Sequence, residues 1–96
     1  MARVVLASAL ARWLSPAPAA DREVAVEVRG ASVGEVLEGL FAMHPGLRRY
    51  VLDEHGAPRR HVALFIDGQA LQPKTDLARP LGEASELYVM QALSGG

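Results

Sequence analysis

The sequence contains no cysteine, and this absence excludes several kinds of chemistry at once. Disulfides cannot stabilise the fold, so a domain of this size must depend on the packing of its apolar side chains. A catalytic cysteine and a zinc–thiolate site on this chain are excluded as well. Any function must therefore come from other groups.

Neither sign of charge is in excess. The 96 residues include 10 lysines and arginines against 11 aspartates and glutamates, which gives a net charge of −1. Nucleic-acid-binding proteins usually carry a basic face, so no nucleic acid is expected among the partners. The one local basic excess comprises Arg48, Arg49, Arg59 and Arg60, and we interpret it as a solvated loop.

Long hydrophobic runs are missing too. No stretch approaches the roughly 20 apolar residues that cross a membrane, so no membrane partner is expected. Residues 4–11, followed by Ala17-Pro18-Ala19, imitate a short signal peptide. Because Arg12 interrupts the apolar run and prolines flank the apparent cleavage point, we interpret residues 3–9 as a first strand and expect a cytoplasmic protein.

Residue constellations typical of catalysis are also lacking. His44, His55 and His61 have no metal-ligand spacing, so no metal site is expected. No pair of carboxylates is placed for acid–base work, and no glycine-rich phosphate loop appears. We therefore expect that this chain is not an enzyme by itself and that it holds no cofactor.

What is present is one domain spanning residues 1–96, half of whose residues are hydrophobic. Residues 23–29 alternate between apolar and polar positions, which predicts a half-buried strand. Together with the strand at residues 3–9 it predicts a β-hairpin. Val24, Val26 and Val28 are the residues expected on the inner face.

A helix is predicted next. Ser32 and Glu35 match a capping box, in which the serine caps the helix and the glutamate accepts from the serine amide. Apolar residues then recur at helical spacing, and His44-Pro45-Gly46 ends the helix. This helix has one apolar stripe, so it must cover one face of a sheet.

The second half of the sequence predicts two more strands. Residues 47–60 are interpreted as irregular, tethered to the core by Leu47, Val51 and Leu52. Residues 61–66 form a strand closed by the turn Asp67-Gly68, and residues 86–90 form the last strand.

The predicted fold class is therefore α+β: a roll with a mixed four- to five-stranded sheet and one main helix packed on one face. Parallel pairing of the first strand with the last would place the first strand inside the sheet. That position explains why residues 3–9 are almost entirely apolar.

The predicted order of strands and helix, together with three sequence segments, resembles that of the MoaD/ThiS family of sulfur carriers. These carriers are relatives of ubiquitin and have the β-grasp fold. The resemblance covers residues 3–96. Its most informative segments are Ala31-Ser32-Val33-Gly34-Glu35-Val36-Leu37 with His44-Pro45-Gly46-Leu47, His61-Val62-Ala63-Leu64-Phe65-Ile66-Asp67-Gly68, and Gly95-Gly96.

The resemblance implies that the carboxylate of Gly96 is the reacting group, preceded by Gly95 in a flexible tail at residues 92–96. A partner enzyme of the ubiquitin-activating type, using ATP–Mg, would adenylate this carboxylate. A sulfur donor would then convert it to a thiocarboxylate, which donates sulfur to a downstream synthase. Glycine suits insertion into a narrow active site because it has no Cβ and adopts any φ.

Outward-facing residues beside this tail predict a docking surface for the partner. Phe65, Tyr88 and Met90 are expected to share the sheet face away from the helix, with Leu93 and Ser94 as further contacts. Two other functions stay open: a ubiquitin-like modifier conjugated through Gly96, or a binding or accessory subunit with an inactive tail. The receiving pathway also stays open among molybdopterin, thiamine, cysteine and other thiolation pathways.

Overall fold

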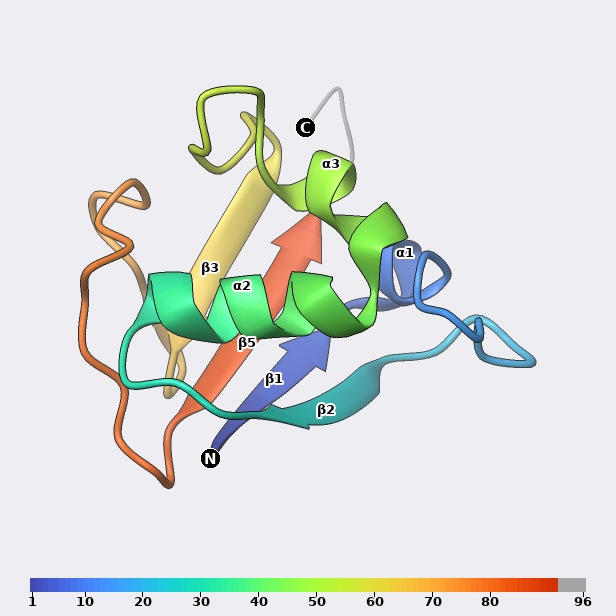
Figure 1. The fold of residues 1–96 in the computed structure, drawn as a ribbon, viewed down its shortest axis with the longest axis horizontal. Coiled ribbons are helices and arrows are strands. Elements are labelled where there is room, and N and C mark those ends of the chain that lie inside the picture. Colours follow the sequence, from blue (N-terminus) through green and yellow to red (C-terminus); the bar gives the residue numbers. More distant parts are fainter. Residues whose placement is uncertain (92–96) are drawn as a thin grey trace.

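The fold is given by a computed structural model that describes residues 1–91. A five-stranded mixed sheet lies at its centre, with strand order β2-β1-β5-β3-β4. One main helix, α2, crosses one face of this sheet (Figure 1). The predicted α+β roll is therefore confirmed. The strands are β1 (Ala2–Leu6), β2 (Val24–Val28), β3 (Val62–Ile66), β4 (Gln69–Ala70) and β5 (Glu86–Gln91).

The first strand lies inside the sheet, as its composition predicted. β1 pairs antiparallel with β2, which confirms the hairpin, and parallel with β5 on its other edge. Alternate residues of β1 point into the core: Val4 and Leu6 are fully buried, whereas Arg3 is exposed. β5 occupies the middle of the sheet because its second edge pairs antiparallel with β3.

β1 is shorter than the expected strand at residues 3–9. It ends at Leu6, and Ser8–Ala11 form a short helix, α1. Leu10 and Ala11 are both fully buried. Consecutive residues of a strand point to opposite faces, so a helical turn is what brings both side chains into the same core.

The helix α2 (Val33–Met43) is capped on its N-terminal side by Ser32 and on its C-terminal side by His44, as predicted. The Ser32 hydroxyl accepts from the amide of Glu35 at 3.2 Å. The Glu35 carboxylate, however, accepts from the amide of Ala31 at 3.0 Å, one residue before the expected partner. The apolar stripe of α2 is buried against the sheet: Val33, Val36, Leu37, Leu40 and Phe41.

The segment after α2 is more regular than expected. Pro45–Leu47 form a 3-10 turn, η1, and Arg48–Val51 form a short helix, α3. Leu47 and Val51 are fully buried and Leu52 is 3% exposed, which confirms the three predicted tethers. The turn geometry follows from this burial, because helical spacing places these side chains on one side of the segment.

β3 and the two-residue strand β4 form a hairpin around Asp67 and Gly68. Their φ angles of 50° and 86° are both positive, as a tight two-residue hairpin turn requires. The Asp67 carboxylate also accepts from the amide of Glu86 at 2.9 Å, which ties the turn to the start of β5. Within residues 1–91, none of the helices has the length and hydrophobicity needed to cross a membrane.

Candidate functional site

The sheet face opposite α2 carries a row of side chains that crosses all five strands. Direct cross-strand partners point to the same face of a sheet, so the pairing register defines the row. Tyr88 of β5 pairs with Val5 of β1 and with Phe65 of β3. The row runs, in strand order, Ala25, Val5, Tyr88, Phe65 and Ala70. We call it the outer row.

Phe65, Tyr88 and Met90 share this outer face, as the alternation of β3 and β5 predicted. The rings of Phe65 and Tyr88 meet edge to face, with their centroids 6.4 Å apart. Met90 lies two residues further along β5, opposite Ala63. All three side chains are partly exposed. The structure thus brings the three residues together, while their role in docking stays a prediction.

A charged row borders the outer row at the beginning of β5. Arg3 pairs in register with Glu27 on one side and Glu86 on the other, and its guanidinium lies 3.5 Å from the Glu86 carboxylate. Towards the end of β5 the outer face remains apolar through Met90 and Ala63. The apolar part of this face therefore extends towards the strand end after which residues 92–96 follow.

Tyr88 is anchored by a contact that the sequence did not indicate. Its hydroxyl donates to the Glu23 carboxylate at 2.6 Å, across the width of β1. This hydrogen bond raises the pKa of Tyr88, and burial and the negative charge of Glu23 act in the same direction. The hydrogen bond thus fixes the direction in which the Tyr88 side chain lies, across β1.

Four of the predicted site residues lie outside the described part of the chain. They are Leu93, Ser94, Gly95 and Gly96, and the expected flexible tail at residues 92–96 lies outside it as well. The last described residue, Gln91, pairs with Val62 at the end of β5. Gly95 and Gly96 are therefore placed only by the sequence, a few residues after the central strand.

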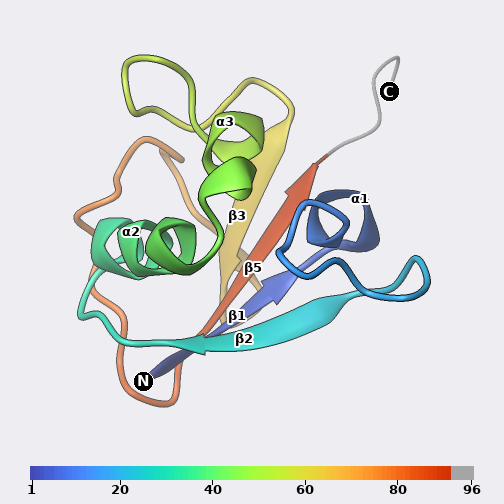
Figure 2. The same cartoon turned by 45° about the vertical axis from the view of Figure 1, so that its right-hand side comes forward.

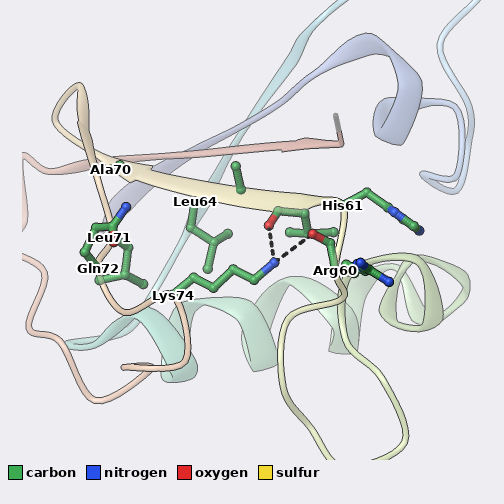
Figure 3. A pocket seen from close by; sticks show the side chains of 9 residues that line it. Arg60, His61, Leu64, Ala70, Leu71, Gln72 and Lys74 are labelled. Carbon is green, nitrogen blue, oxygen red and sulfur yellow. Dashed lines mark hydrogen bonds between the residues drawn. The ribbon is translucent and has the colours of Figure 1, made fainter. Parts of the chain in front are cut away.

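A cleft of about 340 Å³ beside β3 is lined by Arg60, His61 and Lys74, which are residue types that catalytic sites use. Figure 3 shows Lys74 reaching along this cleft to the backbone at the start of β3. Its ammonium group donates to the carbonyl oxygens of Arg59, Arg60 and Val62 at 2.7, 3.0 and 3.0 Å. All three N–H bonds are used, so this amine holds the backbone and is not available as a nucleophile.

We expect Lys74→Met to lower the free energy of unfolding by about 1–3 kcal/mol, because three carbonyl oxygens lose a charged donor. Arg60→Met is the matched control, since Arg60 lines the same cleft but is exposed. Urea denaturation of both variants measures the difference. Equal stabilities of the two variants would show that the three hydrogen bonds contribute nothing.

The acidic and histidine side chains of the described residues form no metal site. Within residues 1–91, no group of three or more histidine, aspartate or glutamate side chains is placed to hold a metal ion. Asp53 is instead a loop anchor: its carboxylate accepts from the amides of Ala57 at 3.1 Å and His55 at 2.8 Å. These hydrogen bonds, the one from Ala57 first, lower the pKa of Asp53.

Comparisons with known proteins identify the fold. No protein-family model matches the sequence. No curated protein matches it either. Among solved structures, SAMP1 from Haloferax volcanii is 28% identical, with a TM-score of 0.74 over 99% of this chain and 98% of that chain. A second structure from Haloferax volcanii, described as small archaeal modifier protein 1, is 25% identical to this chain, with a TM-score of 0.70 over 97% of this chain and 100% of that chain.

Two more distant structures share the same architecture. A chain of the Amycolatopsis orientalis BexX/CysO complex has a TM-score of 0.80, with 19% identity over 100% of both chains. CysO from Mycobacterium tuberculosis has a TM-score of 0.73, with 18% identity over 94% of this chain and 99% of that one. The chain therefore has the ubiquitin-like β-grasp fold, and SAMP1 and CysO stand as its structural neighbours, in agreement with the MoaD/ThiS resemblance of its sequence.

Proposed function

We propose that this chain is a sulfur carrier protein whose reacting group is the carboxylate of Gly96. The observation that carries the proposal is a β-grasp fold in which Gly95-Gly96 follow the central strand β5 within five residues. The likeness to SAMP1 along nearly the whole length of both chains, at 28% identity, supports the ubiquitin-like fold that a sulfur carrier and a protein modifier share. In this proposal, residues 1–91 form the folded domain that the partner enzyme binds.

The chemistry needs only one group from this chain. A carboxylate oxygen of Gly96 attacks the α-phosphorus of ATP, the bond to the β-phosphate breaks, and pyrophosphate leaves. A sulfide sulfur then attacks the acyl carbon, AMP leaves, and the thiocarboxylate remains. Mg²⁺ and the electrostatic stabilisation of both steps come from the adenylating partner. The chain is thus a co-substrate and not an enzyme, and we propose the cytoplasm, where ATP is available, as its compartment.

The direct test of the first step is isotope exchange between pyrophosphate and ATP. A cognate adenylating enzyme should catalyse this exchange only when the chain is added, because the acyl-adenylate must form and reverse. A chain with a C-terminal amide in place of the Gly96 carboxylate should support none. Exchange that does not depend on this chain would contradict the proposal.

Docking of the partner is proposed at Phe65, Tyr88 and Met90, with Leu93 and Ser94 continuing the contact. Partly exposed aromatic and methionine side chains are typical of the centre of protein interfaces. The position of this face supports the proposal, since Met90 lies just before the reacting tail. The BexX/CysO complex is a case in which proteins of this fold assemble with a partner.

We expect Met90→Glu to raise the concentration of the chain that half-saturates the adenylating enzyme by about tenfold, equivalent to about 1.4 kcal/mol. A carboxylate at this position must be desolvated when the partner binds. Ala84→Glu adds the same charge in the exposed loop before β5 and should have little effect. Steady-state kinetics with both variants decides, and equal half-saturating concentrations would exclude Met90 from the interface.

A ubiquitin-like modifier is the second candidate function, favoured by the description of SAMP1 as a small archaeal modifier protein. The same acyl-adenylate would then react with a lysine amine of a target protein and form an isopeptide bond at Gly96. Mass spectrometry of the tagged chain and its conjugates, purified from cells that express it, distinguishes the modifier function from the carrier function. Lysine-linked adducts ending in Gly-Gly support the modifier, whereas a free thiocarboxylate supports the carrier.

A further inference from the structure

Two aromatic side chains from distant parts of the sequence stack on the surface of the protein. Trp13 follows α1 and Tyr50 belongs to α3, and their ring centroids lie 4.1 Å apart with only 9° between the ring planes. Trp13 is 37% exposed, one of three large hydrophobic side chains exposed among the described residues. The indole of Trp13 is thus held against the Tyr50 ring while solvent still reaches part of it.

An arginine side chain lies over each ring of this pair. The guanidinium carbon of Arg12 lies 5.5 Å from the centroid of the Trp13 ring, and that of Arg49 lies 5.1 Å from the centroid of the Tyr50 ring. Arg49 also donates to the Tyr50 hydroxyl at 3.1 Å. We call these four residues, Arg12, Trp13, Arg49 and Tyr50, the aromatic platform.

The charges of the platform are not neutralised within the described structure. Among residues 1–91, neither Arg12 nor Arg49 forms an ion pair with an aspartate or glutamate. The neighbouring Arg48 differs, because it contacts both carboxylate oxygens of Glu38 at 2.7 and 2.9 Å. The expected solvated loop is thus confirmed in its exposure but not in its conformation: Arg48, Arg49 and Arg60 are exposed, whereas Arg48 and Arg49 lie in the helix α3 and not in a loop.

Hydrogen bonds on both sides of Trp13 tie its segment to β5 and to the end of α2. The amide of Ala7, just before α1, donates to the carbonyl of Val89 in β5 at 3.0 Å. The amide of Ser15 donates to His44 Nδ1 at 3.0 Å, which fixes the segment after Trp13 to the end of α2. Figure 2 shows α1 beside the tip of the β5 arrow. The platform therefore lies beside the strand end from which the reacting residues continue.

We propose that the aromatic platform is a second docking site, which takes an acidic segment of the partner protein that acts on the C-terminal residues. The identity of this partner rests on the proposed function. Two exposed guanidinium groups without carboxylate partners bind carboxylates, and the partly exposed Trp13 ring beside them offers apolar contact to the neighbouring side chains of the segment. The overall charge of −1 and the absence of a longer basic stripe favour a protein segment over nucleic acid.

Trp13 is the only tryptophan of the chain, so its fluorescence reports on the platform alone. Titration with a hexaglutamate peptide at low salt should change the Trp13 emission in a saturable way, and hexalysine should not. High salt should weaken the binding, because the contact is between exposed charges. No saturable change with hexaglutamate, or tighter binding of a hexauridylate oligonucleotide than of hexaglutamate, would overturn the proposal.

The double variant R12E/R49E should bind hexaglutamate at least about tenfold more weakly. R22E/R29E is the matched control, because it makes the same change in charge at exposed arginines on either side of β2 and should bind as the unmodified chain does. R12Q/R49Q, which removes the charges without reversing them, should also bind weakly and replaces the first variant if that one unfolds. Equal binding by all these variants would overturn the proposal.

With the adenylating partner, R12E/R49E should raise the half-saturating concentration by about tenfold and leave kcat unchanged. An unchanged half-saturating concentration would exclude that enzyme as the partner of the platform and so contradict the proposal. The peptide titration needs no activity. If the unmodified chain is never adenylated, the proposed function fails, while the titration still decides whether the platform binds acidic segments.

Discussion

A chain that lacks Gly95 and Gly96 is expected to lose adenylation completely and to unfold at the same temperature as the full chain. Each residue spans at most about 3.3–3.6 Å, so this deletion withdraws the terminal carboxylate by about 7 Å. Reacting atoms must approach to about 3–3.5 Å, and the shortened tail cannot reach the ATP bound in the partner. The loss should therefore appear in kcat and not only in KM.

The stability part of this prediction rests on the composition of the core. Every buried core residue of the described chain lies between Ala2 and Val89, so none is removed. The matched control is Gly96→Ala, which keeps the length and the carboxylate but adds a Cβ, and it should retain part of the activity. A melting temperature lowered by several degrees in the deletion variant would show that the two glycines pack against the fold.

A chain beginning at Ala20 is expected to be unfolded or aggregated. This truncation removes β1, which hydrogen-bonds to β2 and β5, and leaves an edge of each without its partner. It also removes α1 and six core residues: Ala2, Val4, Leu6, Leu10, Ala11 and Leu14. The four larger side chains contribute about 1.5–3 kcal/mol each by burial, which sums to most of the roughly 5–15 kcal/mol that stabilises a domain.

The dispersion of amide chemical shifts distinguishes the two forms. The full chain and a control beginning at Ala2, which loses only the exposed Met1, should both give well-dispersed spectra. The Ala20 chain should give a collapsed one. If residues 1–19 were a cleaved signal peptide, the Ala20 chain would be the folded mature form, so a dispersed spectrum would contradict both the role of β1 and the expected cytoplasmic location.

The regular elements with strong periodicity were predictable from sequence. α2 carries a full apolar stripe and a cap at Ser32, and β2 alternates cleanly, so both were placed to within about a residue. The pairing of β1 with β5 followed from the almost entirely apolar composition of β1. α1, α3 and β4 have only two to four residues each, and no such pattern fits in so short a segment. Their stability comes from tertiary packing.

The outer face was predictable in part, because alternation in β3 and β5 fixes which side chains point outward. The cross-strand row itself depends on register, which the sequence does not specify for Tyr88 and Val5. Contacts between distant segments were beyond prediction: Tyr88 meets Glu23 65 residues away, and Trp13 meets Tyr50 across 37 residues. Although no full pattern fits within α1 itself, the i, i+4 spacing of Leu10 and Leu14, which reaches beyond its end, was one available signal of a helical turn there.

Intact-mass spectrometry of the chain after incubation with a cognate adenylating enzyme, ATP–Mg and sulfide tests the central claim most directly. We expect the mass to rise by the difference between sulfur and oxygen, and fragmentation should place the change on Gly96. A chain with a C-terminal amide should keep its mass under the same conditions. Unchanged mass of the unmodified chain with an enzyme that does adenylate it, or sulfur at any residue other than Gly96, would contradict the carrier function.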